Sequence, residues 1–249
     1  MNKAIKYQWS DVKRTLCIYY SVIILVVAFF FIVGMLTKND GETYSSFNGL
    51  EMCTGIFLFV VGLNSFKEQF FMFLQNGISR KSIWKSRVVY SLSLCAFMAV
   101  ADMILMAIGG LFHRIQPNLY FTSVLAGLYQ DWFLQNNAVL VLLVKFLMFF
   151  AVYLAAFCAG YFITMLYYRI GRRGKIALSI GLWGVPFVGF PLVDDLLLNN
   201  RASRFLLEQM FRLLGFNVGN PVPAIITFLA VSIILYGLWY LLGRRAVVK

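Results

Sequence analysis

Residues 16–36 read LCIYYSVIILVVAFFFIVGML, a stretch without a charged side chain. The hydrocarbon core of a bilayer is about 30 Å thick, and a helix rising about 1.5 Å per residue crosses it with roughly 20 apolar residues. The stretch therefore predicts a transmembrane helix. It has no small-residue cleavage site and more apolar stretches follow it, so we expect a retained helix and not a signal peptide.

The composition extends this reading to the whole chain of 249 residues. Hydrophobic residues make up 61% and charged residues only 13%, whereas soluble domains carry about 25% charged residues. We therefore expect an all-α integral membrane protein with a single transmembrane domain, 1–249, and no soluble domain. The predicted spans are about 16–36, 50–66, 88–112, 138–168, 176–193 and 224–242, and the prolines and glycines of the fifth would distort it.

The basic residues predict the orientation of these spans. Sixteen of the 22 lie in the N-terminus, the connection after span two, the connection after span four and the C-terminus, and five lie in the other connections. By the positive-inside rule the first group is cytoplasmic, which places both termini there and requires an even number of spans. Because the bases lie between apolar stretches, the net charge of +12 signals orientation, and we expect no nucleic-acid binding.

The connection between spans two and three has the most distinctive pattern. Residues 67–75 can continue as a Phe-rich helix, which Asn76-Gly77 would end because Gly adopts the left-handed C′ conformation. Ser79 suits the N-cap of the next helix. The pattern predicts a cytoplasmic hairpin with a polar tip. An ordinary basic loop is one interpretation, and a coupling helix that docks into another protein is the other.

Two further segments have helical patterns outside the spans. Trp9, Lys13 and Arg14 mix an aromatic with charge just before span one, which suits either a helix in the inner interface or a simple anchor. Between spans five and six, four charged residues recur at helical spacing opposite an apolar side, and Gly215 follows. This predicts an outer amphipathic helix that lies on the membrane or re-enters it. The four residues are Arg201, Arg204, Glu208 and Arg212.

Two ionisable residues lie at membrane depth. Asp102 in span three and Lys145 in span four are each about 12–15 Å below the outer boundary at 1.5 Å per residue. An unpaired charge there costs at least about 2.5–3.5 kcal/mol. We therefore predict an Asp102–Lys145 ion pair. It would act either as a packing contact between the helices or as part of an ion-coupling or substrate site.

Several chemistries are missing from the sequence. It contains no G-x-x-x-x-G-K-[ST] loop for nucleotide phosphates, no H-E-x-x-H and no G-x-S-x-G motif. The four cysteines lie within or at the edge of apolar stretches and form no C-x-x-C pair. We therefore expect no catalytic residue, no metal site and no cofactor in this chain, which would not be an enzyme by itself.

The stretch LQNGISRK at 74–81 resembles the N-G-[VI]-S-R-[KR] stretch of small bacterial peptide-exporter permeases. Together with the six spans, the hairpin and the outer segment, it makes the chain similar to permeases of the ABC type-2 family, including exporters of phenol-soluble modulins and antimicrobial peptides. The resemblance implies a half-transporter in a bacterial cytoplasmic membrane. Its coupling residues would be Lys67, Glu68, Gln75, Asn76, Gly77, Ser79, Arg80 and Lys81.

The resemblance also implies the partners. A second permease copy, identical or a paralogue, would complete an export pathway for an amphipathic peptide. Two copies of a separate ATPase subunit would bind ATP and Mg²⁺ beneath it. The alternative function is an ion-coupled secondary carrier or channel that uses Asp102 and Lys145.

Overall fold

A computed structural model describes residues 2–36, 45–115, 119–184, 190–191, 194–195 and 201–244. This part of the chain is almost entirely helical. Two short strands, β1 (Ser45–Asn48) and β2 (Leu119–Thr122), accompany the helices. The helices are α1 (Asn2–Leu36), α2 (Leu50–Asn64), α3 (Lys67–Gln75), α4 (Arg80–Ile115), α5 (Val124–Leu128), α6 (Gln130–Gln135), α7 (Ala138–Arg169), α8 (Arg172–Gly184), α10 (Arg201–Leu213) and α11 (Pro221–Arg244).

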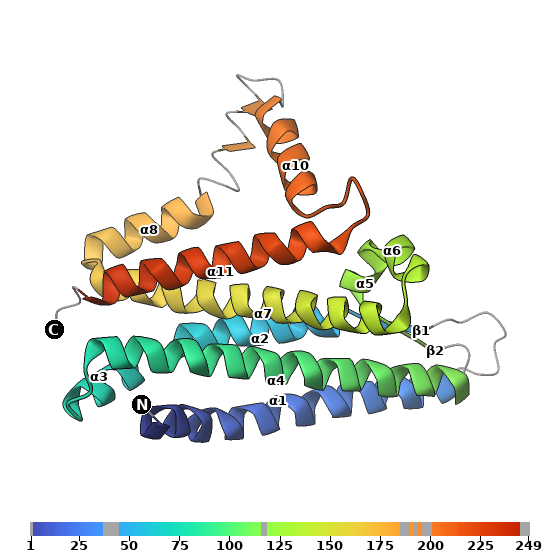
Figure 1. Cartoon of the computed structure of the whole chain (residues 1–249), viewed down its shortest axis with the longest axis horizontal. Helices are drawn as coiled ribbons and strands as arrows, with labels where there is room; N and C mark the ends of the chain where they lie inside the picture. Colours follow the sequence, from blue (N-terminus) through green and yellow to red (C-terminus); the bar gives the residue numbers. More distant parts are fainter. Residues whose placement is uncertain are drawn as a thin grey trace.

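Five helices form a bundle along the long axis of the molecule: α1, α2, α4, α7 and α11 (Figure 1). Each belongs to a stretch long and apolar enough to cross a membrane. These stretches are Ile5–Val33, Leu50–Gln75, Arg80–Leu111, Ala138–Arg169 and Pro221–Gly243. They confirm five of the six predicted spans in type and place, although most of the helices extend beyond the predicted bounds.

The predicted fifth span, 176–193, falls only partly on described residues. Its first part belongs to α8, which ends at Gly184, and residues 185–189 and 192–193 lie outside the described part. A sixth span therefore stays a prediction. Helices α7 and α11 run in the same direction (Figure 1), so the residues between them must return the chain along the length of the bundle.

Helices α2 and α7 pack closely, and two glycines permit it. A Cβ on Gly160 of α7 would lie 2.1 Å from the Phe59 carbonyl oxygen of α2. A Cβ on Gly62 of α2 would lie 2.4 Å from the Phe157 carbonyl oxygen. Thr164 also donates its hydroxyl to the Leu63 carbonyl at 2.7 Å. The two backbones therefore approach as closely as small residues allow in membrane helix pairs.

The N-terminal segment is part of the first long helix. The sequence suggested either a helix in the inner interface or a simple anchor around Trp9, Lys13 and Arg14, and α1 runs unbroken through these residues from Asn2 to Leu36. Its start packs against α4, where the Trp9 indole N–H donates to Ser93 Oγ at 3.2 Å and its ring meets Tyr90 edge-on. These contacts hold the start of α1 along the bundle, and its place in the inner interface stays a prediction.

The strands were not predicted. β1 follows α1 and β2 follows α4, and they pair in parallel with Ser45 opposite Leu119 and Asn48 opposite Thr122. The pairing joins two connections that are far apart in sequence at one end of the bundle, beside α5 and α6 (Figure 1). The start of α1, α3 and the end of α11 lie at the other end.

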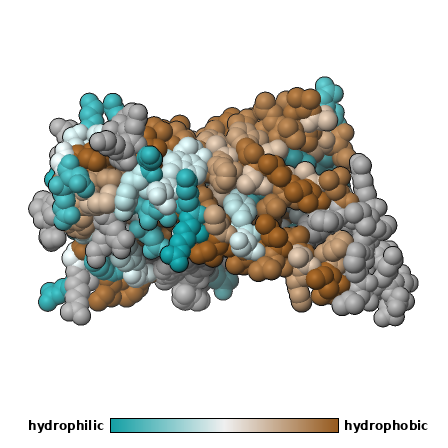
Figure 2. Space-filling view, turned by 90° about the horizontal axis from the view of Figure 1, so that it is seen from below, coloured by the Kyte–Doolittle hydropathy of each residue, from teal (hydrophilic) through white to brown (hydrophobic). Residues whose placement is uncertain are grey.

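The two ends of the bundle differ in polarity. On the face seen in Figure 2, hydrophilic residues gather towards the α3 end, and hydrophobic residues cover the other half. The exposed bases at the α3 end include Lys13, Arg14, Lys81 and Lys85. This asymmetry is the structural counterpart of the charge pattern that predicts a cytoplasmic side.

Candidate functional site

The predicted hairpin forms at the basic end of the bundle. Helix α3 ends in a Schellman motif, in which the Ile78 N–H donates to the Phe73 carbonyl and the Gly77 N–H to the Leu74 carbonyl, both at 3.0 Å. Gly77 has a φ of 71°, the left-handed conformation that Gly adopts without steric cost. Ser79 then caps α4 by accepting the Ser82 N–H at 3.3 Å. The short helix, the reversal and the N-cap are confirmed.

The hairpin has a buried apolar side and an exposed polar tip. Phe70 and Phe73 of α3 and Ile83 of α4 belong to the hydrophobic core. The Gln69 amide also donates to Asp11 of α1 at 2.8 Å, which ties the hairpin to a second helix. The predicted coupling residues exposed at the tip are Gln75, Asn76, Gly77, Ser79, Arg80 and Lys81. The side chains of Lys67 and Glu68 lie outside the described part.

Arg87 fixes the base of the hairpin, although in the sequence it is only one of several bases between spans two and three. Its side chain is 2% exposed. One terminal nitrogen donates to the Ser65 carbonyl at 2.9 Å, where α2 ends, and to Gln69 Oε1 at 2.6 Å. The guanidinium also lies 5.5 Å from the Tyr90 ring centre and 5.1 Å from that of Tyr161. In the sequence, the only hint of its role is its position in the first helical turns after the Asn76-Gly77 reversal. The sequence does not show that its side chain is buried.

Asp102 lies in the interior of the bundle, where tyrosines surround it. It is fully buried. Tyr153 of α7 donates to its Oδ2 at 2.5 Å and Tyr20 of α1 to its Oδ1 at 3.3 Å. Beside them, Tyr19 and Thr54 share a hydrogen bond of 2.6 Å. Hydroxyl groups from two neighbouring helices therefore satisfy the carboxyl group.

Lys145 lies elsewhere. Its ammonium nitrogen is 5.0 Å from the Phe133 ring centre, and its side chain lines a cavity of about 570 Å³ with Met106 and Phe149. Within the described residues Asp102 and Lys145 form no ion pair, so the predicted pair is absent. Asp102 is level with Tyr153, which is eight residues beyond Lys145 on α7 and thus about 12 Å deeper. The predicted third span ended at residue 112, whereas α4 continues to Ile115, so Asp102 lies deeper than predicted.

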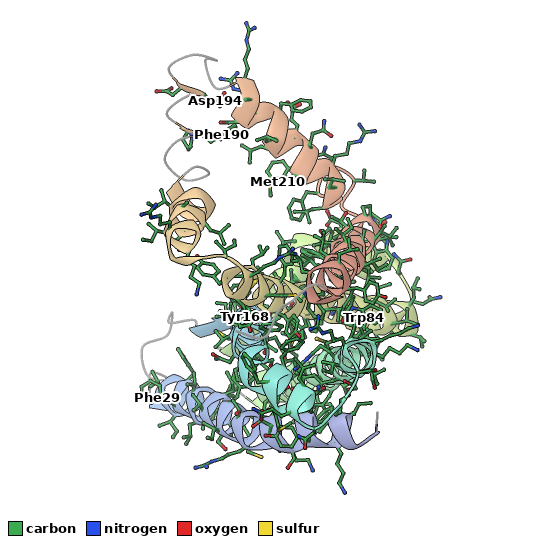
Figure 3. All side chains as sticks on the ribbon, turned by 90° about the vertical axis from the view of Figure 1, so that its left-hand side faces the viewer. Phe29, Trp84, Tyr168, Phe190, Asp194 and Met210 are labelled. Carbon is green, nitrogen blue, oxygen red and sulfur yellow. The ribbon has the colours of Figure 1, made fainter. Side chains whose placement is uncertain are left out.

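The predicted amphipathic helix is α10. Asp194 accepts the backbone N–H groups of Ala202 at 3.0 Å and Ser203 at 2.8 Å, and Figure 3 shows it beside the start of the helix. The Ser203 hydroxyl also donates to Asp194. This bond, together with the two backbone bonds, holds the pKa of Asp194 below its usual range. The other end is a second Schellman motif, in which Phe216 N–H donates to the Phe211 carbonyl at 2.9 Å beyond Gly215.

Helix α10 exposes both of its sides. The predicted polar stripe of Arg201, Arg204, Glu208 and Arg212 is exposed, as expected. The opposite apolar side is also exposed, and none of the helix's residues is buried. The exposed apolar residues are Phe205, Leu206, Leu207, Met210, Phe211 and Leu213. An apolar side of this size is suited to lipid or to a partner.

The described residues include no group of three His, Cys, Asp or Glu side chains placed to hold a metal ion. Five helices that can cross a membrane, with polarity divided between the bundle's ends, define a multi-pass membrane protein. Compared with known proteins, the chain matches no family, no curated protein and no solved structure.

Proposed function

We propose that this chain is the transmembrane permease subunit of an ATP-driven exporter of the ABC type-2 family, located in a bacterial cytoplasmic membrane. Two permease chains would form the pathway, and a separate ATPase subunit would bind ATP and Mg²⁺ beneath each. The cargo would be an amphipathic or antimicrobial peptide. The observation that carries the proposal is the hairpin of α3 and the start of α4, which presents an exposed polar tip at the basic end of the bundle.

The construction of the hairpin suits a docking element. A segment that transmits force has to keep its shape under load, and two capped helix ends with a glycine reversal give this one a defined shape. The buried Phe70 and Phe73 and the Arg87 bonds to Ser65 and Gln69 connect it to α2 and α4. Helix α2 also packs closely on α7. A displacement of the hairpin tip would therefore be transmitted through α2 to α7.

The alternative function, an ion-coupled carrier or channel that uses Asp102 and Lys145, has a weaker basis. Asp102 is fully buried among hydroxyl donors. Lys145 lines a different cavity, and no acidic residue is among the lining residues of that cavity. A carrier that uses both residues would bring them together, and among the described residues Asp102 and Lys145 form no ion pair with each other.

The proposal predicts that changes at the tip uncouple ATP hydrolysis from transport. The chain should co-purify from membranes with an ATPase that carries a phosphate-binding loop. Asn76→Glu places a charge at the tip, and Gly77→Val forces a branched residue into the left-handed conformation. Each should lower permease-stimulated ATP hydrolysis by about tenfold or more, whereas Gly77→Asn, which tolerates that conformation, should retain most of it.

The control is Lys13→Glu, an exposed charge change at the same end of the bundle, on α1. It should leave stimulation unchanged. Normal stimulation in both Asn76→Glu and Gly77→Val would contradict the docking assignment. Transport that needs no ATPase but stops when the proton gradient is dissipated would favour the carrier.

A further inference from the structure

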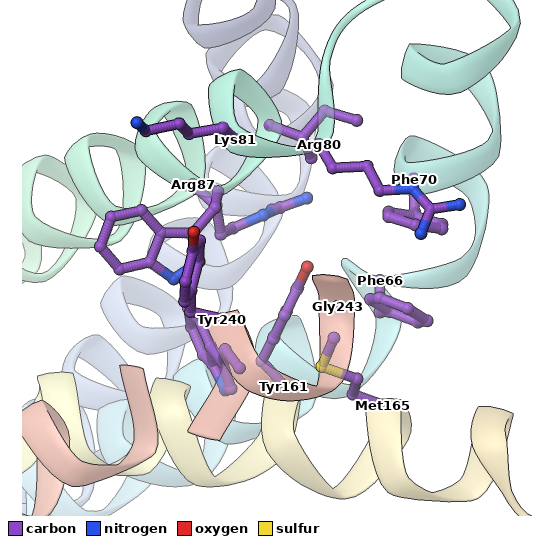
Figure 4. A pocket seen from close by; sticks show the side chains of 12 residues that line it. Phe66, Phe70, Arg80, Lys81, Arg87, Tyr161, Met165, Tyr240 and Gly243 are labelled. Carbon is purple, nitrogen blue, oxygen red and sulfur yellow. The ribbon is translucent and has the colours of Figure 1, made fainter. Parts of the chain in front are cut away.

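A second cavity lies beside the base of the hairpin, at the basic end of the bundle. It has a volume of about 230 Å³ and lies between the starts of α3 and α4 and the ends of α7 and α11 (Figure 4). Its walls are aromatic and apolar, and its mouth is basic. The lining residues are Phe66, Phe70, Arg80, Lys81, Ile83, Trp84, Arg87, Tyr161, Met165, Trp239, Tyr240 and Gly243. None of them is acidic.

Buried hydrogen-bond donors in this lining have no acceptor. Nε and Nη1 of Arg87 have no hydrogen-bond partner among the described residues, and neither has the indole nitrogen of Trp239. Both side chains are 2% exposed. The remaining Arg87 nitrogen is used by Ser65 and Gln69, which orients the guanidinium. A buried donor without an acceptor is unfavourable, so its presence in a cavity points to a missing ligand.

The chemistry of the ligand follows from the lining. All the unpartnered groups are donors and one carries a full positive charge, which calls for an anion with several acceptor oxygens. Lys81 at the mouth adds a further positive charge, and Arg80 also belongs to the lining. A phosphate group offers oxygens in several directions and can meet donors from both α4 and α11.

The position of the cavity favours a lipid as the source of that phosphate. It lies where three membrane-length helices, α4, α7 and α11, end together, which is the level of the headgroups. The last turns of α11 also expose apolar side chains such as Leu238 and Leu241 on the face turned away from the cavity, which is a surface suited to acyl chains at this level. Basic pockets between membrane helices on the cytoplasmic side suit anionic headgroups.

We propose that this cavity binds the phosphate of an anionic phospholipid in the leaflet at the basic end of the bundle, with Arg87 and Trp239 as its buried hydrogen-bond donors. The site is separate from the exposed tip of the hairpin, since Gln75, Asn76 and Gly77 do not line it. It does not depend on the chain's being an exporter.

The test measures lipid retention on the full-length protein by native mass spectrometry. The purified chain is given phosphatidylglycerol, phosphatidylcholine with the same acyl chains, or inorganic phosphate. Phosphatidylglycerol should bind about tenfold more tightly than phosphatidylcholine, and Arg87→Gln should remove this preference. Arg169→Gln, an exposed Arg at the same end, should keep it.

A second variant protects the test against misfolding of Arg87→Gln. Gly243→Leu fills the cavity without changing charge, and a Cβ there meets only the flexible end of Met165, at 3.0 Å. It should also lose the preference for phosphatidylglycerol. Equal retention of the two lipids, or an unchanged preference in both variants, would overturn the proposal. Tight binding of inorganic phosphate without retention of phosphatidylglycerol would overturn the lipid as the source.

Discussion

At the scale of single residues, the structure shows how polar groups are accommodated at membrane depth. Because an unpaired charge at membrane depth is costly, the sequence alone predicts that Asp102 pairs with Lys145. The structure uses hydroxyl donors for Asp102 and an aromatic ring for Lys145. Tyrosine has an apolar ring and is common in membrane helices. The sequence therefore does not distinguish Tyr153 and Tyr20, which donate to Asp102, from the other aromatic residues of the spans.

This arrangement predicts an unequal response to loss of the two tyrosine hydroxyls. Tyr153→Phe removes a hydrogen bond of 2.5 Å to Asp102 and should lower the free energy of unfolding in detergent by about 1.5–3 kcal/mol. Tyr20→Phe removes the longer bond of 3.3 Å and should cost less. In the Asp102→Asn background the Tyr153→Phe cost should shrink, as a double-mutant cycle would measure. An equal cost with and without the Asp102 carboxylate would contradict the assignment.

At the scale of helices, the caps follow from sequence and the helix pairs do not. Gly77 and Gly215 each end a helix with the bonds of a Schellman motif, and both could be predicted because the requirement is local. The sequence places Ala155, Ala156 and Ala159 near Gly160 on α7. It does not show that Gly160 meets α2, because the partner of a small residue depends on how the helices are arranged.

The α2–α7 contact predicts a large difference between two identical substitutions. Gly160→Ala would place a methyl group 2.1 Å from the Phe59 carbonyl oxygen and should force the helices apart, at a cost of roughly 1–3 kcal/mol in unfolding free energy. Gly55→Ala in α2 meets no atom within 4 Å and should be neutral or stabilising. Thermal unfolding in detergent compares the two. A similar melting temperature for both variants would show that the helices can separate without cost.

At the scale of the whole molecule, the polarity of the two ends and the direction of the helices predict which end of the bundle faces the cytoplasm. The start of α1 and the end of α11 lie at the same end (Figure 1), together with α3. Helix α1 exposes apolar side chains such as Ile18, Leu25 and Phe29, a surface suited to lipid. The predicted sixth crossing would lie between α7 and α11.

Cysteine labelling can test this orientation on intact cells. In a background without the four native cysteines, Gln75→Cys and Gln135→Cys place one thiol at each end of the bundle, both at exposed positions. A membrane-impermeant maleimide should label Gln135→Cys in intact cells and Gln75→Cys only after the cells are opened. Arg212→Cys in α10 should behave like Gln135→Cys if residues 170–220 cross the membrane. Labelling of both glutamine positions from the same side would contradict the orientation.

The sequence by itself determined the membrane class, five of the spans, the hairpin with its Asn76-Gly77 reversal and the amphipathic α10. These depend on apolar length, helical spacing and local capping, which act within a few residues. Only the tertiary structure decided the partners of Asp102 and Lys145, the continuity of α1, the β1–β2 pairing and the burial of Arg87. These depend on which distant segments meet. Arg87 shows the difference: its charge suggested an exposed cytoplasmic loop, but packing of α3, α4 and α7 encloses it.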